Sequence, residues 1–84
     1  MRLYGNKVTL TATYVPLGSG HGAFHLTLRN AVGNDTVWIS NDGVTAIGFL
    51  LAGEAKTFYS MAIASVYVKG TAGQFLYWDG EGTQ

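Results

Sequence analysis

Apolar and polar residues alternate along most of this chain with the two-residue period of β-strands. The clearest run is 7–14, where valine, leucine, alanine and tyrosine share one face and three threonines occupy the other. Residues 24–31 repeat the pattern, with phenylalanine and leucines alternating against histidine, threonine and arginine. Four further runs, separated by turns rich in Gly, Asn and Asp, predict strands at 36–40, 55–60, 65–69 and 74–78. Residues 46–51 are apolar throughout, which predicts either a strand covered on both faces or a buried extended crossing between sheets.

The segments between these runs carry turn or loop signals. Pro16 lacks a backbone donor and is followed by several glycines, so we expect residues 15–22 to form a loop. The Asn-Asp-Gly sequence at 41–43 predicts a tight turn. Residues 60–64 are too few to form a stable helix alone, which predicts a single turn or an irregular crossover.

This pattern predicts the fold class and the domain organisation. About seven short strands, turns every 8–12 residues or so, and no substantial helix indicate an all-β fold. We expect a small antiparallel β-sandwich of jelly-roll-like type, with residues 7–78 as its single domain. Residues 1–6 are expected to form an N-terminal arm, and residues 79–84, with their glycines and acids, a flexible C-terminal tail.

The chain carries unusually few charges. Charged residues make up 12% of the 84 residues, about half the roughly 25% usual in soluble domains, whereas 48% are hydrophobic. A free monomer normally keeps charges spread over its exterior, so the deficit predicts that copies of the chain or a partner cover much of the surface. A neutral surface of Thr, Ser, Asn and Gly is the alternative explanation. The chain also lacks cysteine, so oligomerisation is the expected support for so small a core.

The charge balance and hydropathy bear on possible partners. The formal net charge is zero, with five basic and five acidic residues, which disfavours nucleic-acid binding by counterion release. No run approaches the ~20 apolar residues that span a bilayer, and the first residues lack the apolar core of a signal peptide. We therefore expect no nucleic acid and no membrane among the partners, and synthesis in a cytosol-like compartment.

Metal-binding and catalytic patterns are weak. His21 and His25 are the best metal-ligand candidates, with Asp35 or Glu54 as a carboxylate partner. Their four-residue spacing aligns imidazoles only on a helix, whereas these histidines fall in a loop and on a strand, so surface histidines are favoured. The serines lack the strained Gly-x-Ser-x-Gly turn of a nucleophile, and the acids fall at turns and in the tail. We predict that the chain is not an enzyme and has no cofactor or metal site.

The aromatic residues allow two interpretations. Trp38 is predicted on the face opposite Val37 and Ile39, and Trp78 opposite Tyr77, so at least one tryptophan should face outward. Exposed rings stack on sugars or peptides, and they also fill subunit interfaces. Because charge is scarce, we favour an interface, and we predict its residues as Leu3, Tyr4, Trp38, Phe49, Tyr59, Tyr67 and Trp78.

The order of residues between Val37 and Gly73 resembles a pattern found in small β-sandwich virion proteins of phages and prophages. The resemblance covers about half of the chain. The residues that carry it are Val37, Ile39, Asn41, Val44, Thr45, Gly48, Leu51, Gly53, Glu54, Tyr67, Val68, Gly70, Thr71, Ala72 and Gly73.

Many of the proteins with this pattern are capsid decoration or cement proteins. The resemblance implies a bacteriophage structural protein, made in the host cytoplasm, that stabilises the virion head by binding the major capsid protein between its subunits. It implies a small oligomer, specifically a homotrimer, and we expect the arm at 1–6 to reach a neighbouring subunit by strand addition. The alternatives are a carbohydrate- or receptor-binding module of a phage fibre that stacks ligands on Trp38 or Trp78, and another head or tail component.

Overall fold

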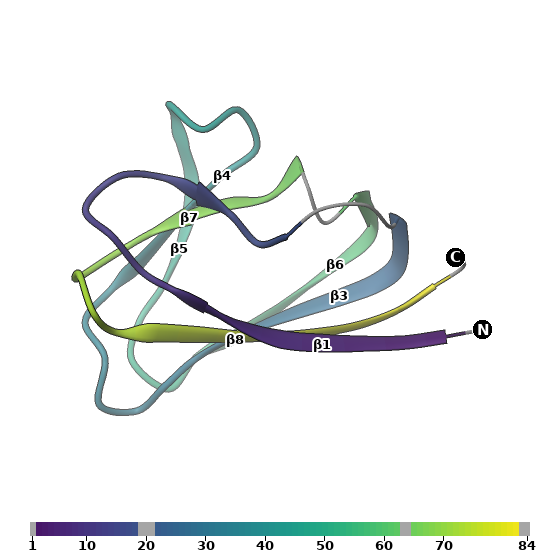
Figure 1. The fold of residues 1–84 in the computed structure, drawn as a ribbon, viewed down its shortest axis with the longest axis horizontal. Helices are drawn as coiled ribbons and strands as arrows, with labels where there is room; N and C mark the ends of the chain where they lie inside the picture. The colour runs from purple at the N-terminus through teal and green to yellow at the C-terminus, as the bar shows by residue number, and fades with distance from the viewer. Residues whose placement is uncertain (1, 19–21, 63–64, 83–84) are drawn as a thin grey trace.

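The computed structural model describes residues 2–18, 22–62 and 65–82, and these residues form eight strands and no α-helix. The strands are β1 (Arg2–Thr9), β2 (Val15–Pro16), β3 (Gly22–Asn30), β4 (Val37–Ser40), β5 (Ala46–Leu50), β6 (Ala55–Ala62), β7 (Tyr67–Lys69) and β8 (Phe75–Gly82). They make two four-stranded antiparallel sheets (Figure 1). The long sheet has the order β1-β8-β3-β6, and the short sheet has the order β2-β7-β4-β5.

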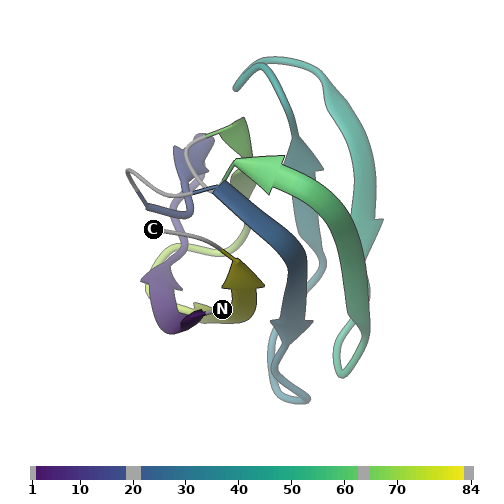
Figure 2. The same cartoon turned by 90° about the vertical axis from the view of Figure 1, so that its right-hand side faces the viewer.

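The strand order is that of a jelly roll. The pairs are nested in the sequence, with β1 beside β8, β2 beside β7, β3 beside β6 and β4 beside β5, as in one long hairpin wrapped into two layers. Every connection except β4–β5 passes from one sheet to the other, and four of these, β1–β2, β3–β4, β5–β6 and β7–β8, lie together at the left of Figure 1. Figure 2 shows two of them, after β3 and after β5, side by side at the bottom. The predicted all-β, jelly-roll-like sandwich is confirmed.

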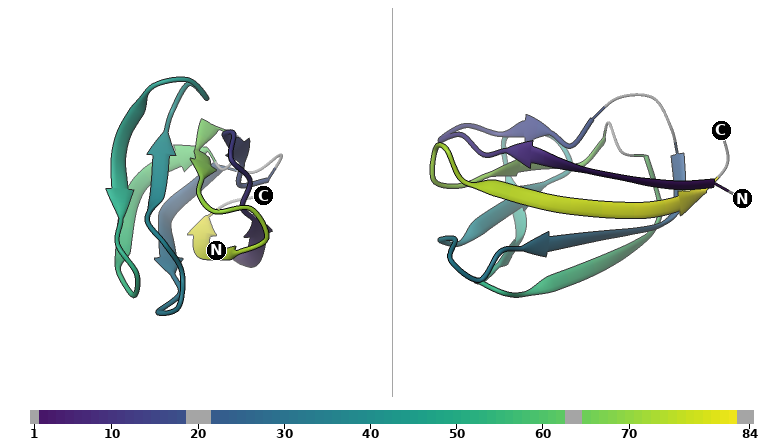
Figure 3. Two further views of the ribbon diagram at one scale, coloured as in Figure 1. Left: turned by 90° about the vertical axis from the view of Figure 1, so that its left-hand side faces the viewer. Right: turned by 60° about the horizontal axis from the view of Figure 1, so that its bottom comes forward.

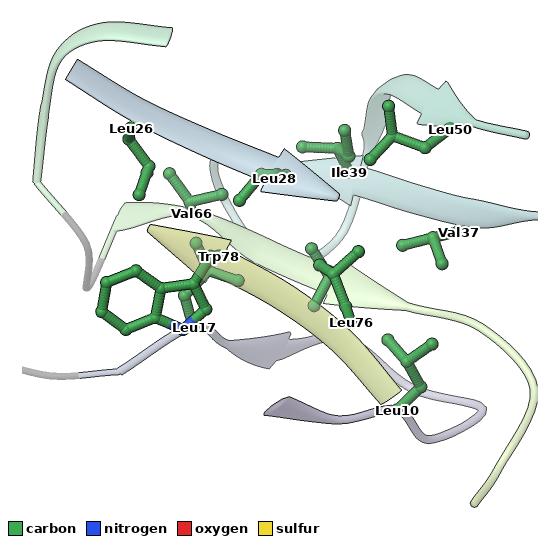
Figure 4. Packing of buried hydrophobic residues seen from close by; sticks show 11 residues of the cluster. Leu10, Leu17, Leu26, Leu28, Val37, Ile39, Leu50, Val66, Leu76 and Trp78 are labelled. Carbon is green, nitrogen blue, oxygen red and sulfur yellow. The ribbon is translucent and has the colours of Figure 1, made fainter. Parts of the chain in front are cut away.

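The core lies between the inward faces of the two sheets. Leu26 and Leu28 of β3 are fully buried, as the two-residue period of their strand predicts. Leu76 and Trp78 continue this layer on β8, and side chains of the short sheet cover it (Figure 4). The remaining buried core residues are Leu10, Leu17, Val37, Ile39, Leu50, Val66 and Val68. Burial of each large aliphatic side chain stabilises the fold by roughly 1.5–3 kcal/mol.

Two predicted boundaries move because the chain changes sheets there. The strand predicted at 7–14 ends at Thr9, and Leu10 leaves β1 with its N–H donated to the Gln74 carbonyl at 2.8 Å. Residues 10–14 then carry the chain to the short sheet. The predicted loop at 15–22 contains the two-residue strand β2, in which Pro16 pairs with Tyr67 at the sheet edge, where the missing proline donor is tolerated.

The predicted arm and tail are instead parts of the long sheet. Residues 2–6 pair with 78–82 along β1 and β8, and the two strands run side by side in Figure 3. β8 also pairs with β3 on its other edge, so it is a central strand. Gly80 permits this close approach, because a Cβ there would lie 2.6 Å from the His25 carbonyl oxygen. The structure therefore corrects the arm at 1–6 and the tail at 79–84 for the residues it describes.

Residues 60–62 of the crossover predicted at 60–64 belong to strand β6. β6 runs on to Ala62, and residues 63 and 64 lie outside the described residues. β6 is one edge strand of the long sheet and follows β5, one edge strand of the short sheet. Among the described residues, each sheet therefore has two edge strands, β1 and β6 in the long sheet and β2 and β5 in the short sheet.

Candidate functional site

The outer face of the short sheet carries a row of large side chains. Trp38 of β4 stands in register between Lys69 of β7 and Phe49 of β5. The Trp38 and Phe49 rings pack with centroids 5.5 Å apart at a tilt of 54°. The Lys69 ammonium lies 4.7 Å from the centroid of the Tyr14 ring, which is a cation–π distance. The row therefore runs from a charged, aromatic end to a purely apolar end.

The apolar end continues along β5. Ile47, two residues before Phe49, is 56% exposed, and Phe49 itself is 49% exposed. Leu51 follows directly on the end of β5 and is 50% exposed, while Trp38 is 41% exposed. We call Trp38, Ile47, Phe49 and Leu51 the apolar face. Four large hydrophobic side chains so close together are uncommon on a soluble monomer and typical of an interaction surface.

The backbone edge beside the apolar face is also weakly protected. β5 has the sequence Ala-Ile-Gly-Phe-Leu and contains neither the charged residue nor the proline that usually blunts an edge strand. It pairs with β4 on one side only. The Lys56 ammonium lies 3.4 Å from the position a Cβ would take on Gly48, and it is the nearest side-chain atom there. Among the described residues the backbone edge of β5 is therefore open to an added strand, and Lys56 lies near Gly48 on the inward face of β5.

A shallow hollow of about 450 Å³ adjoins Trp38 on the side away from Phe49. Asp35, Thr36 and Thr71 line it together with Lys69. The Asp35 carboxylate accepts a hydrogen bond of 2.8 Å from the Thr71 hydroxyl, and the Asp35 N–H donates to the Gln74 side-chain oxygen at 2.9 Å. These bonds tie the β3–β4 connection to the β7–β8 connection and hold the rim of the hollow in place.

The outer face of the long sheet has a second hollow, which we call the polar hollow. It measures about 400 Å³ and is lined by His25, Thr27, Thr57, Tyr59, Asp79, Gly80 and Glu81. Strand register creates it: His25 of β3 stands between Glu81 of β8 and Tyr59 of β6, and Thr27 stands between Asp79 and Thr57. Sequence analysis missed this site, because its residues come from three strands whose pairing no local pattern reveals.

The side chains of the polar hollow hold one another in place. His25 Nδ1 lies 2.8 Å from a Glu81 carboxylate oxygen, and the Thr27 and Thr57 hydroxyls are 3.0 Å apart. The His25 and Tyr59 rings meet edge to face with centroids 5.0 Å apart. The Arg29 guanidinium lies 3.6 Å from the Asp79 carboxylate at the margin. The hollow thus presents hydroxyls, carboxylates, an imidazole and a phenol ring in an organised array.

The predicted interface residues do not form one surface. Trp38 and Phe49 lie together on the apolar face, and half-buried Tyr67 lies on the same sheet beneath the turn at Gly43. Tyr59, which is 68% exposed, belongs to the polar hollow on the other sheet. The backbones of Leu3 and Tyr4 pair with Glu81 and Gly80 in β1, and their side chains lie outside the described structure.

Trp78 requires a correction. Its side chain is only 8% exposed and packs in the core near Leu17 (Figure 4), so it is available neither to a partner surface nor to a stacking ligand. The indole Nε1 is buried without a hydrogen-bond partner among the described residues. Trp78 therefore contributes volume to the core, and Tyr77, its neighbour on β8, is the residue that faces outward.

The turn between β4 and β5 is held by an acidic side chain. The Asp42 carboxylate accepts hydrogen bonds from the Val44 N–H at 2.7 Å, the Thr45 N–H at 2.8 Å and the Ser40 hydroxyl at 2.8 Å. The backbone bonds from Thr45 and Val44, followed by the Ser40 bond, lower the pKa of Asp42 from 3.8 to about 2. This network fixes the turn that covers Tyr67 and leads into the apolar face.

The described residues show neither a metal cluster nor a membrane-spanning helix. No group of three or more His, Asp or Glu side chains in them is placed to hold a metal ion, and none of their segments is a helix long and apolar enough to cross a bilayer. His25 pairs with Glu81 instead of Asp35 or Glu54, and His21 lies outside the described residues.

Comparison with known proteins finds no family model, no curated protein and no solved structure that matches this chain.

Proposed function

We propose that this chain is a structural protein of a bacteriophage or prophage virion, specifically a decoration or cement protein that binds between subunits of the major capsid protein. The observation that carries the proposal is the apolar face beside the open edge of β5. The low charge of the chain and the sequence pattern from Val37 to Gly73 support it. A protein whose role is to bind other subunits needs an exposed apolar surface that is already formed, and it needs no reactive side chains.

The exposed area of the apolar face is sufficient for useful binding energy. Trp38 is 41% exposed and Phe49 is 49% exposed, so each presents roughly 100 Å² if a whole aromatic residue offers about 200–250 Å². At about 25 cal/mol per Å², covering either ring would stabilise a complex by up to about 2.5 kcal/mol. Two adjacent residues of this size are typical of the energetic centre of an interface.

The partner is expected to be an extended apolar segment of the major capsid protein. Such a segment would pair with the free edge of β5 through its backbone and place alternate side chains against Phe49 and Ile47. We propose that the docked form is a small homo-oligomer, a homotrimer by the sequence resemblance. Repeated copies bound between capsid subunits would stabilise the shell by mass action.

The experiment measures co-sedimentation of the purified protein with shells assembled from the major capsid protein of the same phage. Phe49→Ala should weaken binding by roughly ten- to seventyfold, since 1.4 kcal/mol corresponds to a factor of ten. Tyr77→Ala is the matched control, because Tyr77 is 48% exposed but lies on the long sheet, and it should change binding less than twofold. Wild-type protein that does not bind shells, or equal binding by Phe49→Ala, would contradict the proposal.

A further inference from the structure

The polar hollow has the chemistry of a small-molecule site, and we propose that it binds a neutral sugar, a hexopyranoside of a glycan. The inference holds whether or not the chain decorates a capsid, because it rests on the opposite sheet. The hollow, at about 400 Å³, falls in the roughly 300–1,000 Å³ range of small-molecule sites. Its lining combines hydroxyls and carboxylates with one broadly exposed ring.

The donors and acceptors match a ring that carries several hydroxyl groups. The Asp79 and Glu81 carboxylates can each accept hydrogen bonds from sugar hydroxyls, and the Thr27 and Thr57 hydroxyls can donate as well as accept. Asp79 and Glu81 are two residues apart on β8, so both point to the same face of the sheet. This spacing lets the two carboxylates contact different hydroxyls of one ring.

Tyr59 supplies an apolar surface for the C–H groups of a sugar. The residue is 68% exposed, and the edge-to-face contact with His25 at 5.0 Å holds its ring at the side of the hollow. Glu81 is fixed by its 2.8 Å contact with His25, and the two threonine hydroxyls are fixed by each other. Because these groups are already ordered, a ligand would lose little free energy in arranging them.

The charge balance favours a neutral ligand over a cation. The Arg29 guanidinium lies 3.6 Å from the Asp79 carboxylate, and His25 Nδ1 lies 2.8 Å from a Glu81 oxygen, so each carboxylate in the hollow already has a nitrogen neighbour. A free amine or a metal ion would have to compete with these neighbours. A sugar hydroxyl would only add a hydrogen bond to a carboxylate that keeps its nitrogen neighbour.

The test uses saturation-transfer NMR with the full chain and methyl glycosides of glucose, galactose, mannose and N-acetylglucosamine. We expect millimolar binding of at least one glycoside, and a loss of at least tenfold in affinity in Tyr59→Ala and in Asp79→Asn. Tyr77→Ala is the control, because Tyr77 lies on the same face outside the hollow, and it should retain wild-type affinity. Circular dichroism establishes that each variant is folded.

Two results with the glycosides, and one with a cationic competitor, would overturn the proposal. One is the absence of transfer to every glycoside of the panel in folded wild-type protein. The other is a glycoside that binds Tyr59→Ala and Asp79→Asn as tightly as wild type, because that ligand would occupy another surface. Methylammonium chloride serves as a cationic probe, and competition by it at the same concentration as the glycoside would identify a cation site instead of a sugar site.

Discussion

The two tryptophans should respond in opposite ways to the same substitution. Trp78 is 8% exposed and packs in the core, so Trp78→Ala leaves a cavity that typically costs about 3–5 kcal/mol. A domain of this length has a total stability of roughly 4–13 kcal/mol, so this loss removes much of it. Trp38 is 41% exposed, so its removal leaves no enclosed cavity and should cost less; its ring pair with Phe49 contributes about 0.5–1.5 kcal/mol beyond the area it buries.

The assay is urea unfolding at 25 °C, followed by far-ultraviolet circular dichroism. The free energy of unfolding should fall further in Trp78→Ala than in Trp38→Ala, with an unchanged denaturant slope in both. Each variant keeps one tryptophan, so fluorescence gives an independent measurement. The emission of Trp78 alone should be blue-shifted relative to that of Trp38 alone, because the indole of Trp78 is shielded from water.

The variant Trp78→Phe tests whether Trp78 stabilises the fold by filling volume or by a hydrogen bond of its indole nitrogen. The indole Nε1 of Trp78 has no partner among the described residues, so phenylalanine loses no hydrogen bond and should recover most of the stability that alanine loses. Equal destabilisation by Trp38→Ala and Trp78→Ala would refute the assignment of one tryptophan to the surface and the other to the core. A phenylalanine variant as unstable as the alanine variant would contradict the assignment of the Trp78 contribution to apolar packing.

Three further predictions concern the fold and its turns. Asn30→Ala should lower the free energy of unfolding, measured by urea titration, by about 2–4 kcal/mol, because this buried amide donates to two carbonyls and accepts from a third group. As a control, Asn41→Ala at an exposed position should change the free energy of unfolding by less than about 0.5 kcal/mol. Deleting residues 1–6 should lower the melting temperature, because five of them pair with β8; an unchanged melting curve by circular dichroism would restore the arm hypothesis. The pKa of Asp42 is lowered to about 2, so the stabilisation of the turn by its carboxylate is present above pH 4 and lost as the pH falls toward 2. The NMR chemical shift of the Val44 amide proton, which binds this carboxylate, should follow the loss, and Asp42→Asn should abolish the pH dependence.

Sequence periodicity predicted the fold class because burial in a sandwich follows the two-residue period of a strand. Leu26 and Leu28 on β3, and Val37 and Ile39 on β4, are inward-facing as their alternation indicates. The same periodicity does not predict that residues 10–14 cross from the long sheet to the short sheet. Alternation continues through Tyr14, but the backbone bonds of Leu10 and Gly70 that redirect the chain join segments about 60 residues apart.

The same limit explains the errors at the chain ends and at Trp78. Polar and glycine-rich ends resemble flexible segments unless their pairing partner, about 75 residues away, is known. Alternation placed Trp78 and Tyr77 on opposite faces of β8, but parity alone does not say which face is buried. The outward orientation of Trp38 could be predicted, because both of its neighbours on β4 are β-branched core residues.

Asn30 shows why buried polar contacts escape sequence reasoning. An asparagine after an amphipathic strand reads as the start of a turn, and the chain does turn there. Yet its side chain is 3% exposed and donates to the carbonyls of Asp35 at 3.0 Å and Leu50 at 3.1 Å. These bonds tie the end of β3 to the end of β5, which supports the strand that carries the apolar face. Only the three-dimensional register reveals this role.

The apolar face and the polar hollow belong to different sheets, so their outer surfaces point away from each other. A protein docked through β5 should therefore keep its polar hollow open to solvent. Phe49→Ala should lose shell binding but keep glycoside binding, and Tyr59→Ala should lose glycoside binding but keep shell binding. Shell-bound wild-type protein should bind the glycoside with the affinity of free protein. If docking blocks the glycoside, the chain must contact the capsid through its long sheet, and the assignment of the apolar face to docking is wrong.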